Sequence, residues 1–440
     1  MTSAQSALAE ASAGPKRYAV GGRGAYAILT VTTLLFIVNW MDRQVMSVVL
    51  EPMKKDLGFS DAQMASLQTL FMISVGAFAL PVGLLVDRWS RRKMLALLAF
   101  VWSVTTFLTG LVSQIVLLWM VRFFVGVGEA GYKPGGAGWL SVAFPREGRA
   151  RAIGILDLGI PVGAALGVVI GGTVATATGN WRIPFFTFAI PGIVLAILCL
   201  FLPDYATVKT AGERRLSGSF LVEVLGLLKI KTVLYTTIAS IIYNFVMVAL
   251  ISWAPAFFMR GFHLTEAEAG EIAGLLFVMG ALGVVGAGWL GDLWHRRNPA
   301  GRALACAVIA ILMVLVKMVF LWSFSTGSLT LVIAVGVLDS ILATGYNPLY
   351  ETMVQDPVTP RHRASSMGML LLWNFVLGAA WGPLFVGVIS DAAGSGFAGL
   401  QIAFWLTMPV ALLCPFFHIL AARSYIADTA GVKDEALAER

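Results

Sequence analysis

Four charged residues stand inside long apolar runs near the start of the chain, where a charge is costly. Asp42 and Arg43 are adjacent in the first run, and Arg122 and Glu129 lie seven residues apart in a later one. If these runs cross a bilayer, each charge costs roughly 2.5–3.5 kcal/mol and needs a partner or water. A carboxylate in such a place is a candidate proton carrier, and an arginine there can bind an anionic headgroup or simply neutralise the acids.

Helix geometry indicates which of these charges meet. The first run ends near Leu50 and the later one begins near Ile115, both on the outer side of the membrane. At 1.5 Å per residue, Asp42 lies about 12 Å and Arg122 about 10 Å from that side, so we expect them to pair. Glu129 shares a face with Arg122 and lies about 10 Å deeper. We therefore predict that Glu129 carries the proton, with Asp42 as its partner. The alternative is a static ion-pair network, in which Glu129 could pair with Lys133, four residues on.

The composition requires lipid as the solvent for much of this chain. Hydrophobic residues make up 58% and charged residues 12% of the 440 positions, and the mean hydropathy is +0.83. Soluble domains are nearer 45–50% apolar and about 25% charged. The net charge of +7 is then expected on cytoplasmic loops and not on a nucleic-acid surface. The three Cys lie in apolar runs and the four His are scattered, so we predict no disulfide, metal or other cofactor.

Twelve apolar runs are long enough to cross about 30 Å of hydrocarbon. They lie near residues 26–50, 65–86, 94–112, 115–144, 153–176, 184–202, 233–258, 269–290, 303–322, 329–353, 366–389 and 397–420. Lys and Arg concentrate in alternate connections, so the positive-inside bias predicts that both termini are cytoplasmic. The N-terminal segment, Met1 to Gly24, lacks the contiguous apolar core of a cleavable signal peptide, so we expect the first run to stay in the mature protein. We expect a multi-pass protein of the plasma (inner) membrane.

Internal repetition divides the chain into two halves. Ser60-Asp-Ala-Gln63 recurs as Thr265-Glu-Ala-Glu268, and each has the pattern of a capping box that begins a helix. We expect a cytoplasmic tail (1–24), an N-terminal six-helix half (25–203), a cytoplasmic linker (204–230), a C-terminal six-helix half (231–422) and a second cytoplasmic tail (423–440). Duplicated halves are typical of secondary transporters, in which the halves rock about a central site.

The duplication also contains a basic loop. Gly83-x-Leu-x-Asp87 recurs 205 residues later as Gly288-x-Leu-x-Asp292, and Asn39 has a counterpart in Asn244 at the same offset. Both loops lie at cytoplasmic ends of spans. There, contacts between the halves would hold that side shut and break on opening. The predicted gate residues are Gly83, Asp87, Arg88, Arg91, Arg92 and Asp292.

These residues resemble a known family. The run from Gly83 to Lys93, Gly-Leu-Leu-Val-Asp-Arg-Trp-Ser-Arg-Arg-Lys, resembles the signature loop of the major facilitator superfamily. Asn39-Trp-Met-Asp-Arg43, Arg122-Phe-Phe-Val-Gly-Val-Gly-Glu-Ala130 and Gly159-Ile-Pro-Val-Gly163 are similar to the spinster branch. The resemblance implies an all-α fold of twelve transmembrane helices in two pseudo-symmetric halves. It also implies proton-linked or facilitated export of amphiphilic lipids such as lysophospholipids and sphingosine phosphates. The chain departs from this pattern at Lys133-Pro134, where family members carry small hydroxyl residues, and at Asp157, where an aromatic residue is expected.

The second half lacks counterparts of the four charges. Asp42 and Arg43 correspond to Met247 and Val248, and the positions of Arg122 and Glu129 carry Gly and Ala. We therefore expect an apolar wall from the seventh span, with Phe245, Met247 and Trp253, facing a charged wall from the first half. Asp339 stands alone in the tenth span and is a second candidate protonation site. The candidates for substrate binding or charge pairing are Asn39, Arg43, Arg122, Tyr132, Lys133, Asn244 and Met247.

The sequence thus predicts a secondary transporter that moves an amphiphilic lysolipid-like or sphingolipid-like substrate by alternating access with proton coupling. Its partners would be membrane lipids, the substrate and protons, with no nucleic acid, and we expect a monomer. A transporter of small organic anions is the alternative, because Arg43, Arg122 and Lys133 could hold a carboxylate equally well. The scattered His residues argue against an enzyme.

Overall fold

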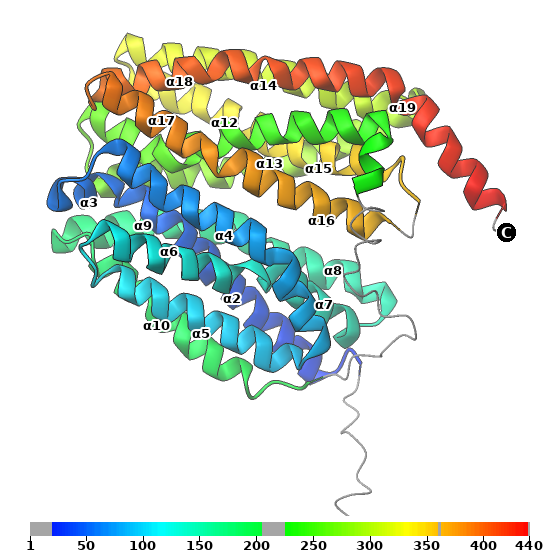
Figure 1. Ribbon diagram of the computed structural model, residues 1–440, viewed down its shortest axis with the longest axis horizontal. Coiled ribbons are helices and arrows are strands. Elements are labelled where there is room, and N and C mark those ends of the chain that lie inside the picture. Colours follow the sequence, from blue (N-terminus) through cyan, green and yellow to red (C-terminus); the bar gives the residue numbers. More distant parts are fainter. Residues whose placement is uncertain (1–19, 205–224, 360–361, 439–440) are drawn as a thin grey trace, which may run out of the picture.

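A computed structural model describes residues 20–204, 225–359 and 362–438, and every regular element in these ranges is helical (Figure 1). Most of the predicted N-terminal tail and most of the predicted linker therefore fall outside the described residues, whereas the predicted second tail (423–440) is helical as far as Ala438. The helices form two bundles that lie side by side with their axes nearly parallel, one from each half of the chain (Figure 1). The predicted all-helical architecture in two halves is confirmed.

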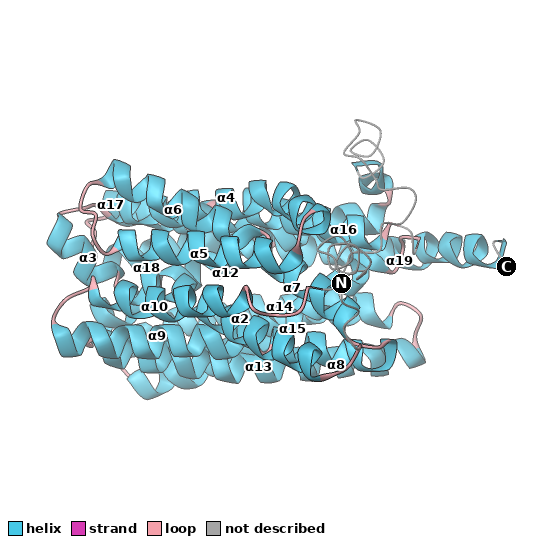
Figure 2. Cartoon of the chain, turned by 90° about the horizontal axis from the view of Figure 1, so that it is seen from below, coloured by secondary structure: helices cyan, strands magenta, loops and turns pink. Residues whose placement is uncertain are grey.

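Within residues 20–204, the first bundle contains nine helices. They are α2 (Arg23–Val48), α3 (Leu50–Leu57), α4 (Asp61–Arg88), α5 (Arg91–Thr109), α6 (Ile115–Ala130), α7 (Tyr132–Ala143), α8 (Arg146–Asp157), α9 (Gly159–Thr178) and α10 (Ile183–Cys199). The short helix α3 marks one end of the molecule, here called the α3 end. The opposite end, where α2 begins and the last helix runs out of the bundle, is here called the tail end (Figure 2).

The second bundle follows with longer helices. They are α12 (Lys231–Phe262), α13 (Glu266–Arg297), α14 (Gly301–Ser323), α15 (Leu329–Gln355), α16 (Arg363–Trp373), a π-helical segment (Asn374–Ala379), α17 (Trp381–Ala392), α18 (Phe397–Ala411) and α19 (Leu413–Ala438). Two 3₁₀ turns, Leu227–Lys229 and Phe324–Thr326, precede α12 and follow α14.

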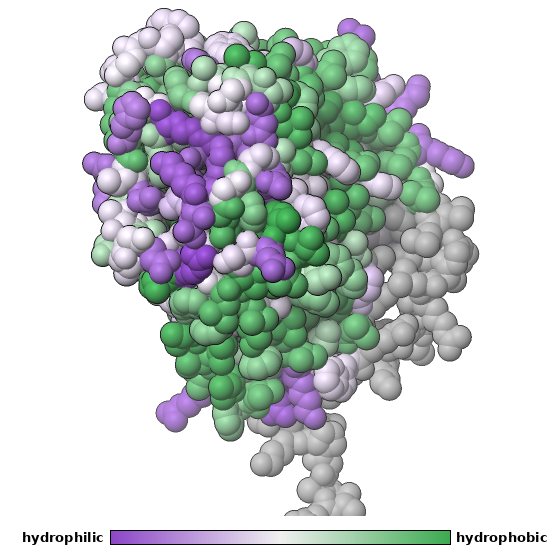
Figure 3. Space-filling view, turned by 60° about the vertical axis from the view of Figure 1, so that its left-hand side comes forward, coloured by the Kyte–Doolittle hydropathy of each residue, from purple (hydrophilic) through white to green (hydrophobic). Residues whose placement is uncertain are grey.

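Eleven of the described helices or helix pairs are long and apolar enough to cross a membrane. Several predicted spans are broken helices, since α6 with α7, α8 with α9, α16 with α17, and α18 with α19 each form one apolar crossing. The sixth predicted span is α10, an apolar helix of only 17 residues. Polar side chains gather over the α3 end, and the adjoining flank is apolar (Figure 3). That distribution is the one expected of a helical bundle surrounded by lipid.

The duplicated capping boxes are confirmed. Ser60 accepts a hydrogen bond from the backbone N–H of Gln63, and the Gln63 side chain accepts one from the Ser60 N–H at 2.9 Å. Thr265 and Glu268 form the same reciprocal pair at the start of α13. Each cap begins a helix at the α3 end, where the first four N–H groups of a helix have no partner within the helix.

The glycine-lined face of α9 allows two backbones to approach closely. A Cβ at Gly163 would lie 2.4 Å from the carbonyl oxygen of Ile37 on α2, and one at Gly167 would lie 2.6 Å from that of Met41. Small residues are what permit such approach between membrane helices. The same helix α9 also packs against α13 of the second bundle. It therefore links the helix that carries Asp42 and Arg43 to the opposite half.

Candidate functional site

The charged residues of the first half form a buried cluster, but not with the predicted pairing. The Nε of Arg43 donates to Oε2 of Glu129 at 2.5 Å, and Glu129 is 2% exposed. Lys133 pairs instead with Asp157, at 3.2 Å. The helix breaks between α6 and α7, around Gly131, and this break separates Glu129 from Lys133. Spacing of four residues predicts a contact only within one continuous helix.

The predicted pair between Asp42 and Arg122 is not formed. Oδ2 of Asp42 accepts a hydrogen bond from the hydroxyl of Thr106 on α5. The fully buried guanidinium of Arg122 lies 4.9 Å from the centre of the Phe71 ring, and none of its nitrogens donates a hydrogen bond to a described residue. The depth of a residue along its helix does not determine the direction in which its side chain leaves the helix.

A cavity of about 660 Å³ separates the two halves, and both halves line it. Its charged lining residues are Arg43, Asp157, Asp339 and Glu351. Apolar and aromatic side chains form most of the remaining wall, among them Trp40, Met247, Trp253, Phe277 and Phe320. The structure thus brings Arg43, Asn244 and Met247 of the predicted set into one cavity. Through Arg43, the cavity wall is connected directly to buried Glu129.

Other predicted binding residues lie away from this cavity. Tyr132 is buried within the first bundle, where its hydroxyl donates to the carbonyl of Thr32 at 2.9 Å. Asn39 and Arg122 are also fully buried and do not line the cavity. Phe245 packs on Phe385 instead of facing the cavity.

The prediction that Asp339 stands alone in the second half is wrong. Oδ2 of Asp339 accepts a hydrogen bond from the Nζ of Lys317 at 2.7 Å, and both side chains are buried. Sequence reasoning missed Lys317 although the rule that found the first cluster, a charge within an apolar run, applies to it. The tenth span, α15, also presents polar side chains to the cavity along one face. These are Asp339, Ser340, Thr344, Asn347 and Glu351.

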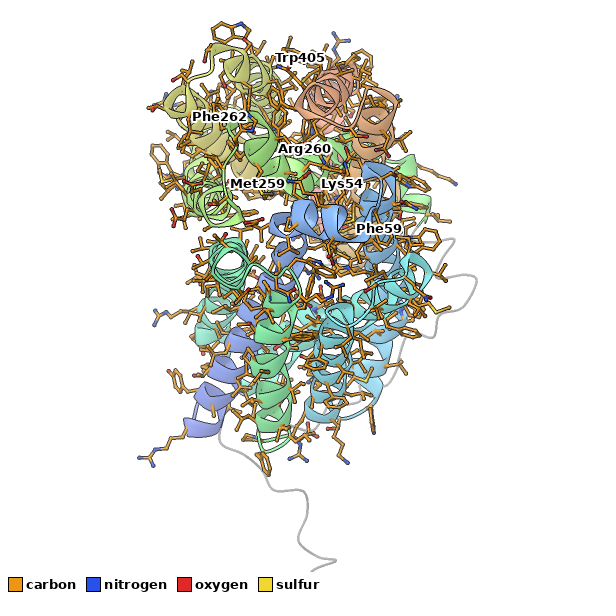
Figure 4. The ribbon with its side chains drawn as sticks, turned by 90° about the vertical axis from the view of Figure 1, so that its left-hand side faces the viewer. Lys54, Phe59, Met259, Arg260, Phe262 and Trp405 are labelled. Atoms are coloured by element: carbon orange, nitrogen blue, oxygen red, sulfur yellow. The ribbon has the colours of Figure 1, made fainter. Side chains whose placement is uncertain are left out.

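An ion-pair network joins the halves at the α3 end. Arg260 at the end of α12 donates to Asp61 through two nitrogens, at 2.8 and 2.7 Å, and also to Glu51. Lys54 reaches Asp61 at 2.5 Å, and Asp391 accepts from the Asp61 N–H at 2.9 Å. We call these five residues the α3-end latch. Arg260 and Lys54 lie together where the two bundles meet (Figure 4). The latch therefore ties the two halves together at this end.

Beside the latch, Asp56 on α3 lies outside the membrane-spanning helices. It accepts from the indole of Trp181 at 2.9 Å and from Arg182 at 2.7 Å. These two contacts hold the pKa of the Asp56 carboxyl below its usual range. Both partners belong to the first half, so this contact braces one bundle and does not join the two.

At the tail end, the polar contacts of two predicted gate residues, Arg92 and Asp292, stay within one half. Arg92 donates to the carbonyl of Leu202 at 3.2 Å, and Asp292 pairs with Arg302 at 2.8 Å. Arg91 is buried and Gly83 is half-buried. The side chains of Asp87 and Arg88 are outside the described part of the structure. Within that part, no group of three or more His, Cys, Asp or Glu residues is arranged to hold a metal ion.

Two pseudo-symmetric helical bundles around a central cavity, joined by ion pairs at one end, define the architecture of an alternating-access membrane transporter. The sequence matches the family model described as Major Facilitator Superfamily over residues 32–323. That match covers more than half of the chain, which therefore belongs to the major facilitator superfamily.

The relatives include spinster proteins. The chain is 27% identical to protein spinster homolog 1 of Xenopus tropicalis over 91% of its own length and 80% of the relative's. It is 25% identical to the sphingosine-1-phosphate transporter SPNS2 of the same frog, over 92% and 82%. It is also 26% identical to the hexuronate transporter of Bacillus subtilis, over 92% and 97%. Among solved structures, a bacterial homolog of the human lysosomal transporter Spinster, in an inward-facing and unoccupied conformation, shares the fold. Its TM-score is 0.80 at 24% identity, over 92% of this chain and 98% of that one.

Proposed function

We propose that this protein is a proton-coupled transporter of an amphiphilic, single-chain lipid of the lysolipid or sphingolipid type. The observation that carries the proposal is the composition of the central cavity. Its wall is largely apolar and aromatic, and a few charged side chains stand in it. A cavity of about 660 Å³ is within the 300–1,000 Å³ typical of small-ligand sites. The sphingosine-1-phosphate transporter among the relatives supports the same class of substrate.

Proton coupling is assigned to Glu129, with Asp42 as its partner and Asp339 as a second site. Glu129 is buried and hydrogen-bonded to Arg43, which lines the cavity. Protonation of Glu129 would neutralise the carboxylate and release the Arg43 guanidinium toward the substrate. Binding and proton transfer would then be linked through one hydrogen bond. In the second half the arrangement is reversed, since the acid Asp339 lines the cavity and the base Lys317 lies behind it.

The proposed orientation places the tail end in the cytoplasm, in the plasma (inner) membrane, because the basic connections lie at that end. With the latch closed at the α3 end, the structure would then be inward-facing, and the latch would be the outer gate. The basic loops that contain Asp87 and Asp292 would form the inner gate when the tail end closes. In this structure the contacts of Arg92 and Asp292 lie within single halves, as expected when the inner gate is open.

Transport of small organic anions is the second candidate, and the hexuronate transporter among the relatives favours it. A thermal-shift screen separates the two. Purified protein in detergent is tested at two pH values against lysophospholipids, sphingosine phosphate and hexuronate. The proposal predicts stabilisation by the lipids, with a pH dependence that Glu129→Gln removes. Stabilisation by hexuronate alone would refute the lipid assignment.

A further inference from the structure

Glu351 differs from the other charged residues of the cavity wall because no residue in the described part of the chain forms an ion pair with it. Arg43 pairs with Glu129, Asp157 with Lys133, and Asp339 with Lys317. Glu351 is half-buried near the tail end of α15, and no described base lies within 4.0 Å of it.

The position of Glu351 suits a ligand and not a structural partner. Asn347, one turn earlier on the same helix, also lines the cavity, and Thr344 precedes it on that face. From the opposite half, Lys133 and Asp157 lie within electrostatic range of Glu351. Those two already neutralise each other through their own ion pair. The excess charge of this part of the cavity is therefore one carboxylate.

We infer that Glu351 binds the ammonium group of the transported molecule, so that the substrate is a zwitterionic or cationic amphiphile. The inference rests on the proposed function and narrows its substrate class. A half-buried carboxylate without a partner favours a cation, and charge-assisted hydrogen bonds are the strong ones. The polar face of α15 would hold the amine-bearing headgroup. The apolar wall from α9, α12 and α13 would hold the chain of the lipid.

The same chemistry would also select a small free amine. The apolar wall favours the amphiphile, because a small amine would leave most of it in contact with water. Ethanolamine phosphate is the headgroup of lysophosphatidylethanolamine without its glycerol and acyl chain. It serves as the probe that distinguishes binding of a small free amine from binding of an amphiphile.

The test compares two lysolipids with one acyl chain, lysophosphatidylethanolamine and lysophosphatidylglycerol, which differ in the terminal ammonium. Binding to the full-length protein in detergent is measured by competition against radiolabelled lysophosphatidylethanolamine. We expect tighter binding of the ethanolamine lipid and about a tenfold loss of that preference in Glu351→Gln, with binding of the glycerol lipid retained. Glu271→Gln, which removes an exposed carboxylate on α13, is the matched control.

Equal weakening of both lipids in Glu351→Gln would overturn the inference, because it would show a structural role. Equal affinity of the wild-type protein for both lipids would overturn it as well, while leaving the amphiphile transporter intact. Displacement by ethanolamine phosphate as strong as by the lipid, and dependent on Glu351, would support ammonium binding and refute the proposed lipid function.

Discussion

Replacing Arg260 with Ala is expected to open the α3 end. The substitution removes two hydrogen bonds to Asp61, one to Glu51 and one to the carbonyl of Ser395. Asp61 keeps Lys54 as a partner, but Glu51, at 7% exposure, is left without a described one. An uncompensated buried charge costs about 3 kcal/mol at the low end of measured values.

That cost is specific to the closed state, because the latch residues come from both halves. A penalty of about 3 kcal/mol corresponds to roughly a 100-fold change in an equilibrium constant. A closed-to-open ratio near 100 would therefore fall to about 1. This ratio can be measured by double electron–electron resonance, which gives the distribution of distances between two spin labels. The labels are placed at Lys55→Cys and Ala398→Cys, both exposed positions at the α3 end. The native cysteines are replaced in that background.

We expect one short distance in the parent protein and a second, longer distance of comparable weight in the Arg260→Ala variant. Arg182→Ala is the matched control, since Arg182 forms its ion pair at the same end but within one half. The reasoning is refuted if Arg260→Ala leaves the distance distribution unchanged, or if Arg182→Ala changes it equally.

Three further predictions concern stability. Gly163→Ala should lower the free energy of unfolding by about 1–3 kcal/mol, because the added Cβ would lie 2.4 Å from a backbone oxygen. Gly286→Ala is the control, since open space surrounds that position, and it should leave the free energy of unfolding unchanged. Unfolding by SDS titration measures both variants. Asp339→Asn should lower the free energy of unfolding by about 3 kcal/mol, because it leaves buried Lys317 unpaired. Adding Lys317→Met should restore most of that stability. A double variant as unstable as Asp339→Asn alone would argue against the ion pair. The depressed pKa of Asp56 stabilises the folded protein above the ordinary carboxyl pKa of 3.8, and this contribution disappears as pH falls through the lower folded value. The difference in melting temperature between the parent and Asp56→Asn should therefore shrink as pH falls below about 4, and a constant difference would contradict this.

The fold could be predicted because its signals are strong and periodic. Apolar runs of membrane length fix the helices, and the duplicated caps at Ser60 and Thr265 fix where two of them begin. The broken helices were not predicted. The interruption near Gly131 and the π-helical segment Asn374–Ala379 depend on packing between helices, and hydropathy does not report it.

The sequence predicted which residues belong to the charged cluster better than it predicted which of them pair with each other. Arg43 and Glu129 could be identified as charges within apolar runs, because a buried charge in a membrane is costly and needs a partner. Which base meets which acid depends on the rotation of each helix about its axis, and a single sequence gives depth but not rotation. Arg260 and Glu351 lie near span ends, where charged residues are ordinary, so only the three-dimensional structure distinguishes them.

The most direct test of the central claim is lysolipid flux into proteoliposomes with and without an imposed pH gradient. The account predicts that a gradient accelerates flux through the parent protein, and that Glu129→Gln retains basal flux but no longer responds to the gradient. Flux that ignores the gradient in the parent protein, or a Glu129→Gln variant that responds as the parent does, would contradict proton coupling through Glu129.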